Sequence, residues 1–202
     1  MNMNVIDLEQ YRQQQRRILN QDRVSELEEK LEDRLMQVLS EDKYGSDWSS
    51  LDYLGWELLY HDHKNVLGLI GRAYAICKYN LERSSRYMED AIASDTHKEI
   101  ATRSFLHLAD QYKYNWNLAS SKRVIPAIGF SLEHFSDDER MMEITLRLAL
   151  HFRNFNIDGM IRGAYNNLRV LNTETAEKYR PVAGLSVRQP PKLKLVGGEK
   201  WK

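Results

Sequence analysis

Apolar residues recur along most of the chain at intervals of three and four residues, which is the period of an amphipathic helix. In the stretch "VSELEEKLEDRLMQVLSED" they share one face, and charged residues occupy the others. These positions are Val24, Leu27, Leu31, Leu35, Val38 and Leu39. A second run, "SLDYLGWELLY", has four inward positions: Leu51, Leu54, Leu58 and Leu59. Residues 20–179 lack the alternating pattern of a strand, so the sequence predicts an all-α fold.

From Lys64 the helical stretches fall into three pairs, at residues 64–94, 97–135 and 137–171. The first helix of each pair contains an aliphatic residue, a small residue, two variable positions and an aromatic residue. The three matches are Ile70-Gly71-x-x-Tyr74, Leu108-Ala109-x-x-Tyr112 and Leu148-Ala149-x-x-Phe152. A small residue lets a partner helix come close, and the aromatic residue fills the space between pairs. The repeat therefore predicts stacked helical hairpins, as in an α-solenoid.

Start signals agree with these boundaries. Ser136 and Glu139 have the spacing of a capping box before the third pair, and Asp158 can cap its second helix. The chain has only one proline, Pro126, before residue 180. Because proline is the strongest helix breaker, its near absence supports long helical stretches.

The first hairpin, "IGRAYAICKYNLERSSRYMEDAI", resembles a tetratricopeptide repeat. The matching positions are Ile70, Gly71, Tyr74, Tyr87, Ala91 and Ile92. The resemblance covers about residues 66–171 and implies that the first helices line a concave face. The small residues lie 38 and then 40 positions apart, which is longer than the family's period of about 34 residues. The resemblance thus favours a hairpin stack more than membership of the family.

Composition divides the chain into three parts. Residues 1–21 are rich in Gln and Arg and predict a flexible segment, whereas residues 22–179 predict a single all-α domain. Residues 180–202 carry six Lys/Arg against one acid, while residues 1–42 carry ten acids against six Lys/Arg. Pro190-Pro191 favours an extended backbone, so we expect a basic, extended C-terminal tail. This tail is either a disordered terminus or a peptide-like segment that docks on a partner.

Charge and cysteine content bound the environment. The charges cancel to zero, so no strong field draws the whole molecule to nucleic acid or membrane. Cys77 is the one cysteine, which excludes a disulfide within the chain and favours a reducing compartment. No cationic leader opens the sequence, and its apolar runs fall far short of the ~20 residues of a membrane span. We expect a cytoplasmic protein with no membrane partner.

Two histidines flank an aspartate in "LLYHDHKNVLG", which raises the question of a metal site. On a helix, His61 and His63 would point about 200° apart, so they cannot share one ion there. No third ligand has recognisable spacing. A solvated helix end, with Asp62 or Asn65 capping the next helix, explains the stretch better.

The acidic positions Glu26, Glu29 and Glu32 have the Glu-x-x-Glu spacing of all-α nucleotide pyrophosphatases, but they also form the expected charged face of an amphipathic helix. The sequence has no glycine-rich phosphate loop and no nucleophile elbow. A metal-dependent hydrolase is therefore only a third hypothesis. We expect no catalytic residue, no bound metal and no cofactor.

A hairpin stack without enzyme motifs predicts a non-catalytic adaptor, regulator or assembly component that binds another protein or a peptide. In the repeat register, positions beside the small residue and one turn further on would face the concave groove. They are Arg72, Asp110, Lys113, Tyr114, Arg153 and Asn154. Residues 22–42 could also form a short coiled coil, so a homo-oligomer through that segment or the tail is a further expectation.

The competing hypothesis is a nucleic-acid-binding regulator that uses the hairpin at 137–171 and the basic tail. Arg162, Asn166 and Arg169 recur at i, i+4 and i+7, and these residue types read guanine and adenine edges. Lys192 and Lys194 of the tail would contact phosphates. Affinity that falls steeply with salt would distinguish this hypothesis from peptide binding.

Overall fold

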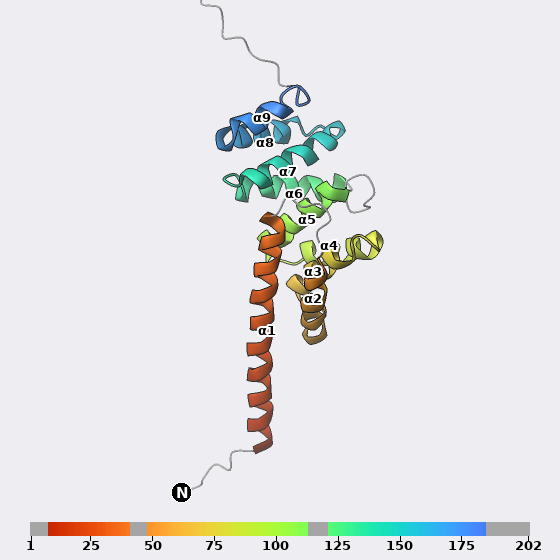
Figure 1. Cartoon of the computed structure of the whole chain (residues 1–202), viewed down its shortest axis with the longest axis vertical. Coiled ribbons are helices and arrows are strands. Elements are labelled where there is room, and N and C mark those ends of the chain that lie inside the picture. Colours follow the sequence, from red (N-terminus) through yellow and green to blue (C-terminus); the bar gives the residue numbers. More distant parts are fainter. Residues whose placement is uncertain (1–7, 41–47, 113–120, 185–202) are drawn as a thin grey trace, which may run out of the picture.

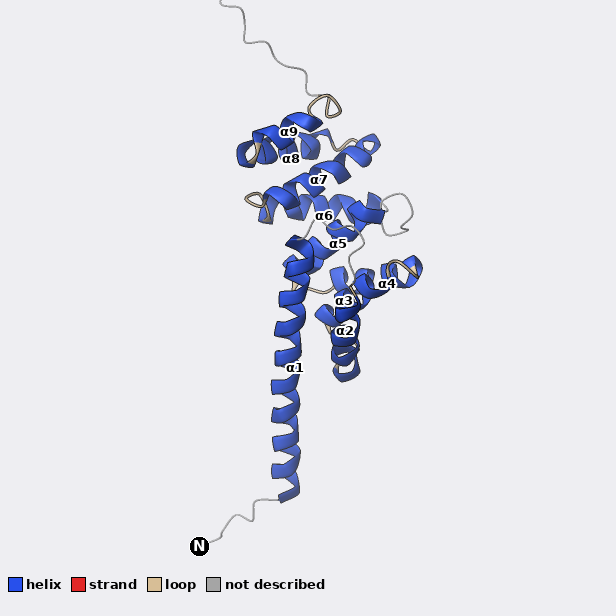
Figure 2. Ribbon diagram, in the orientation of Figure 1, coloured by secondary structure: helices blue, strands red, loops and turns tan. Residues whose placement is uncertain are grey.

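The computed structural model describes residues 8–40, 48–112 and 121–184, which form helices joined by short connections (Figure 2). The helices are α1 (Leu8–Ser40), α2 (Ser49–His61), α3 (Val66–Ile76), α4 (Leu81–Ala93), α5 (Lys98–Tyr112), α6 (Ser121–His134), α7 (Glu139–His151), the 3₁₀ turn η1 (Arg153–Phe155), α8 (Asp158–Leu171) and α9 (Thr173–Tyr179). Within these ranges no residue belongs to a β-strand. The predicted all-α class is confirmed.

Each helix packs against the next one along the chain, and α2 to α9 form an elongated stack (Figure 1). A second set of contacts joins alternate helices: α3 packs on α5, α5 on α7, and α6 on α8. This is the contact pattern of hairpins stacked side by side. The pairs α3/α4, α5/α6 and α7/α8 coincide with the three predicted hairpins.

Helix α1 begins at Leu8, so residues 8–21 are helical, whereas the sequence predicted a flexible segment over residues 1–21; residues 1–7 lie outside the described part of the chain. Residues 8–21 contain no glycine or proline and are rich in Leu, Gln and Arg, all of which favour a helix. Figure 1 shows the N-terminal part of α1 extending past the other helices. Its C-terminal part packs on α2, α3 and α5.

The predicted apolar face of α1 is buried in the core of its own chain. Its buried members are Leu27, Leu31, Leu35, Val38 and Leu39. A coiled coil between two copies through this face would have to withdraw these side chains from the core. The structure therefore assigns the apolar face from Leu27 to Leu39 to packing within the chain, and a homo-oligomer through other parts of residues 22–42 or through the tail stays a prediction.

Three glycines let α2 and α3 pack backbone against backbone. A Cβ on Gly55 would lie 3.0 Å from the carbonyl oxygen of Gly68 and 3.0 Å from the amide nitrogen of Arg72. A Cβ on Gly71 would lie 3.0 Å from the carbonyl oxygen of Leu51. Gly71 is the small residue of the first predicted repeat, and its close contacts are with α2 and α1 rather than with α4, the second helix of its predicted hairpin.

Tyr74, the aromatic residue of the same repeat, is fully buried and joins α3 to α5. Its hydroxyl lies 2.8 Å from Nδ1 of His107. The Trp48 ring packs edge-on against the Tyr74 ring, and the two ring centroids are 4.9 Å apart. Burial raises the pKa of the Tyr74 phenol, so the group stays protonated. This cluster ties α3, α5 and the residue before α2 together.

The helix start signals were predicted with mixed success. The Asn65 side chain accepts a hydrogen bond from the Gly68 amide at 2.9 Å and caps α3, as predicted. The capping box at Ser136 is wrong, because Asp138 caps α7 by accepting from the Met141 amide at 2.9 Å. Asp158 is the first residue of α8 rather than its cap. Ile157, the residue before α8, is buried, and its side chain makes no capping hydrogen bond.

We predict that Gly55→Ala lowers the free energy of unfolding by about 1–3 kcal/mol, because the added methyl meets backbone atoms that cannot move aside. Gly163→Ala is the matched control, since its Cβ would lie 3.7 Å from the Leu132 side chain, an ordinary contact. We expect that variant to be neutral or stabilised by up to about 1 kcal/mol, because alanine favours helix. Urea unfolding followed by circular dichroism measures both. Equal stability of the two variants would contradict the close α2–α3 contact.

Candidate functional site

Two of the six residues predicted to bind a partner are buried. Arg72 is 8% exposed and forms an ion pair with Asp52 of α2. Asp110 is 4% exposed and accepts hydrogen bonds from Arg147 of α7 at 2.7 and 3.1 Å. The prediction that both side chains lie open in a groove is therefore wrong.

Neighbouring helices cover these positions. The glycine contact brings α2 over α3, so that the Arg72 guanidinium lies 5.6 Å from the centroid of the Trp56 ring. On α7, Arg147 reaches both Asp110 and Glu143, at 2.7 and 3.1 Å. The sequence predicted that Arg72 and Asp110 face a groove. In the structure each side chain instead forms an ion pair with a neighbouring helix, and both residues stabilise the stack.

The other four predicted residues have different outcomes. Lys113 and Tyr114 lie outside the described residues. Arg153 and Asn154 are exposed and belong to η1, directly after α7. Partner binding through Arg153 and Asn154 stays a prediction, and their surroundings are described below.

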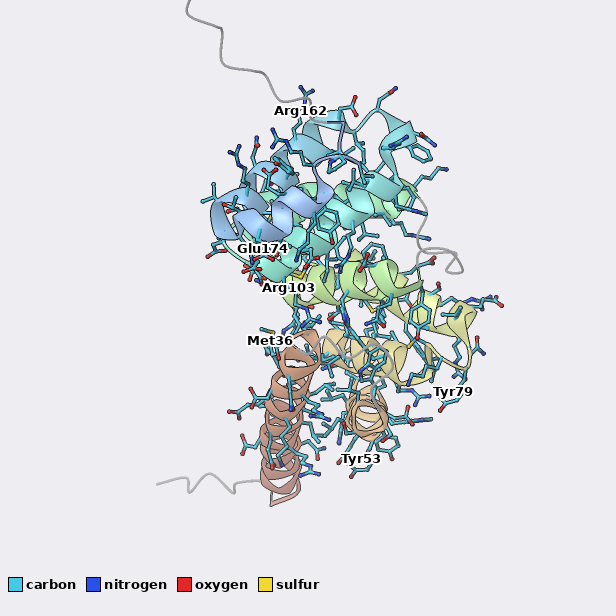
Figure 3. All side chains as sticks on the ribbon, turned by 45° about the horizontal axis from the view of Figure 1, so that its top comes forward. Met36, Tyr53, Tyr79, Arg103, Arg162 and Glu174 are labelled. Carbon is cyan, nitrogen blue, oxygen red and sulfur yellow. The ribbon has the colours of Figure 1, made fainter. Side chains whose placement is uncertain are left out.

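Helix α2 exposes three aromatic side chains on one face, at positions i, i+3 and i+7. The exposed fractions are 66% for Tyr53, 56% for Trp56 and 81% for Tyr60. The opposite side of the helix carries the buried Leu51 and Leu58. Figure 3 shows Tyr53 on the side of α2 that faces away from the rest of the stack. We call these three residues the α2 aromatic stripe.

Charged side chains border the α2 aromatic stripe. Glu57 lies 2.9 Å from Arg23 of α1. The Tyr53 hydroxyl and the Arg23 guanidinium hold the pKa of the Glu57 carboxyl below its usual range, and Glu57 in turn raises the pKa of the Tyr53 phenol. Arg72 stacks against Trp56. Tyrosine, tryptophan and arginine are the residues most enriched at the energetic centre of protein interfaces.

A second feature lies at the C-terminal end of the stack. A hollow of about 470 Å³ opens between η1, the start of α8 and the turn after α9, and we call it the terminal hollow. Its charged and polar side chains are Arg153, Asn154, Asp158 and Arg162. Arg153 and Asn154, which were predicted to bind a protein, thus line the same hollow as Arg162, which was predicted to bind nucleic acid.

The remaining residues of the nucleic-acid hypothesis continue from this hollow. Asn166 and Arg169 are exposed further along α8, and Arg169 lies 3.9 Å from Glu177. Lys192 and Lys194 lie outside the described residues. Nucleic-acid binding by this group stays a prediction.

The histidine stretch forms the solvated end of α2, as predicted. His61 is the last residue of the helix, and the Asp62 side chain accepts a hydrogen bond from the Lys64 amide at 2.9 Å. On α1, Glu26 pairs with Lys30 at 2.5 Å. Across the described ranges, no three His, Cys, Asp or Glu side chains are grouped so that they could hold a metal ion. The same ranges contain no helix with the length and apolarity that crossing a membrane needs.

We predict that Arg147→Met lowers the free energy of unfolding by about 3 kcal/mol, because it removes the cation that the buried Asp110 carboxylate faces. Arg86→Met is the control, since Arg86 pairs with Glu82 on the exposed side of α4. Its loss should change stability by less than about 1 kcal/mol. Thermal unfolding of both variants tests the difference, and a similar loss in the two would contradict a structural role for the Arg147–Asp110 pair.

The chain was compared with protein-family models, with curated proteins and with solved structures, and none of them matches it. The α2 aromatic stripe and the terminal hollow therefore carry the functional inference.

Proposed function

We propose that this chain is a non-catalytic adaptor that binds another protein through the α2 aromatic stripe. The observation that supports it is the exposure of Tyr53, Trp56 and Tyr60 on one helix face. Large aromatic side chains usually lie in the core, and a row of them at the surface forms the kind of patch that marks interaction sites. Tyrosine and tryptophan are also enriched among the residues that dominate binding energy.

The stripe sits on a firmly held helix. Backbone contacts through Gly55 and Gly71 fix α2 against α3, and Arg23 links Glu57 to α1. A surface that is already ordered loses little conformational entropy on binding. Anchors at i, i+3 and i+7 suit a helix that lies in an apolar groove of its partner.

A tetratricopeptide-like repeat is part of this proposal. It is supported by the burial of all three small residues, Gly71, Ala109 and Ala149, and by the successive contacts of α3, α5 and α7. In this view the repeats are a frame that presents α2, rather than a groove that binds along its length.

We also propose the cytoplasm as the place where the protein works. Cys77 is buried, and burial raises the pKa of its thiol. With this one cysteine the chain cannot form a disulfide within itself, which suits a reducing compartment.

We predict that the double variant Tyr53→Ser/Tyr60→Ser loses its protein partner. Trp56 stays in place, because it packs on Arg72 and its removal would also disturb the α2–α3 contact. The matched control is Tyr79→Ser in the turn after α3, which is 87% exposed and lies away from the stripe (Figure 3). The measurement is quantitative affinity capture from a native lysate, with and without nuclease, using full-length protein.

Wild type and the control should recover a stoichiometric protein band that survives nuclease. The double variant should recover at least about tenfold less, because truncating each anchor weakens binding by about 1 kcal/mol or more. An undiminished band with the double variant, or recovery of nucleic acid alone, would overturn the adaptor proposal.

A further inference from the structure

We propose that the terminal hollow is a binding site for single-stranded nucleic acid, which it holds by the phosphate backbone. This site is independent of the α2 aromatic stripe, because the two lie at opposite ends of the stack formed by α2 to α9 (Figure 1). Figure 3 labels Arg162 at one end and Tyr53 at the other.

Arg153 and Arg162 supply the positive charge. Among the described residues neither guanidinium forms a salt bridge, and Arg162 uses only Nε, which donates to the backbone carbonyl of Asp158 at 3.4 Å. Nearby Arg147, by contrast, is paired with Asp110. The hollow therefore presents two arginine side chains with open donors against one carboxylate, that of Asp158. Arginine donors of this kind match the oxygens of a phosphate group.

An exposed aromatic residue directly follows the lining residues Arg153 and Asn154 in the chain. Phe155 belongs to the same turn as Arg153 and Asn154 and is 54% exposed. The Phe152 ring supports it from the core side, with centroids 6.0 Å apart. Cations that meet phosphates next to a ring that stacks on a base are the elements of single-strand recognition. Stacking needs an unpaired base, so a single strand fits better than a duplex.

The basic tail starts from the rim of the hollow. Val182, Ala183 and Gly184 line it, and residue 185 follows directly. Residues 185–202 contain five Lys/Arg against one acid, Glu199. The sequence that follows the hollow is therefore basic in composition. A single phosphorylated side chain would use only the two arginines, whereas a single strand offers phosphates to the arginines and bases to the exposed Phe155 ring, so nucleic acid is the favoured ligand.

The test is fluorescence anisotropy of labelled single-stranded DNA and RNA, each of about 16 nucleotides or more, with the full-length protein at about 50 and 200 mM salt. The site variant is Arg153→Gln/Arg162→Gln. Its control is Arg83→Gln/Arg86→Gln on α4, which removes the same charge from exposed positions elsewhere. Thermal unfolding confirms that both variants fold.

We expect wild type to bind at least one strand with an affinity that falls with salt. The site variant should bind about tenfold more weakly at low salt, with a salt slope shallower by about 1.4, while the control stays within about twofold. Phe155→Ser should weaken binding by about fivefold or more and leave the salt slope unchanged, because stacking releases no counterions.

Three outcomes would overturn the proposal. The first is no binding of either strand, including the case in which inorganic phosphate alone binds. The second is an equal loss in the site variant and the α4 control, which would show only non-specific charge. The third is full binding by the site variant together with loss in Lys192→Gln/Lys194→Gln, which would assign the contact to the tail alone.

Discussion

Helices α2 and α3 touch through their backbones, and the arrangement of the N-terminal half follows from that contact. Gly55, Gly68 and Gly71 leave no space for a side chain between the two helices. Close-packed interiors tolerate little added volume, so the orientation of α2 is set by α3. The Tyr74–His107 contact then fixes α5 against α3, and the remaining hairpins stack on α5.

The same contact decides what each face of α2 does. Its leucine face is buried, and Asp52 and Trp56 come over Arg72, which changes from an expected partner contact into a support for α2. The opposite face has nothing left to pack against in the described part of the chain, so Tyr53 and Tyr60 stay exposed. A structural requirement of the α2–α3 pair thus creates the surface on which the adaptor proposal depends.

The stack holds two surfaces of different chemistry apart. Aromatic rings with bordering charges suit a protein, whereas open arginine donors around the terminal hollow suit phosphate. Between them, pairs such as Arg147–Asp110 join successive hairpins and lend stability rather than recognition. Together the two proposals describe a chain that could link a protein partner to a single strand, with the helical stack as a spacer.

Helical periodicity and small-residue spacing are local properties of the chain, so they were enough to predict the helical class, the three hairpins and the position of Tyr74 between hairpins. The sequence also held the signal for the α2 aromatic stripe, since Tyr53, Trp56 and Tyr60 alternate with the inward leucines at helical spacing. Only the tertiary structure decided that Arg72 and Asp110 are covered and that Arg153 and Arg162 share one hollow. Those outcomes depend on how closely the helices approach one another and on which turns meet at the end of the stack. The spacing of residues along one helix predicts which face is buried, but not the distance to a neighbouring helix or the contacts between distant turns.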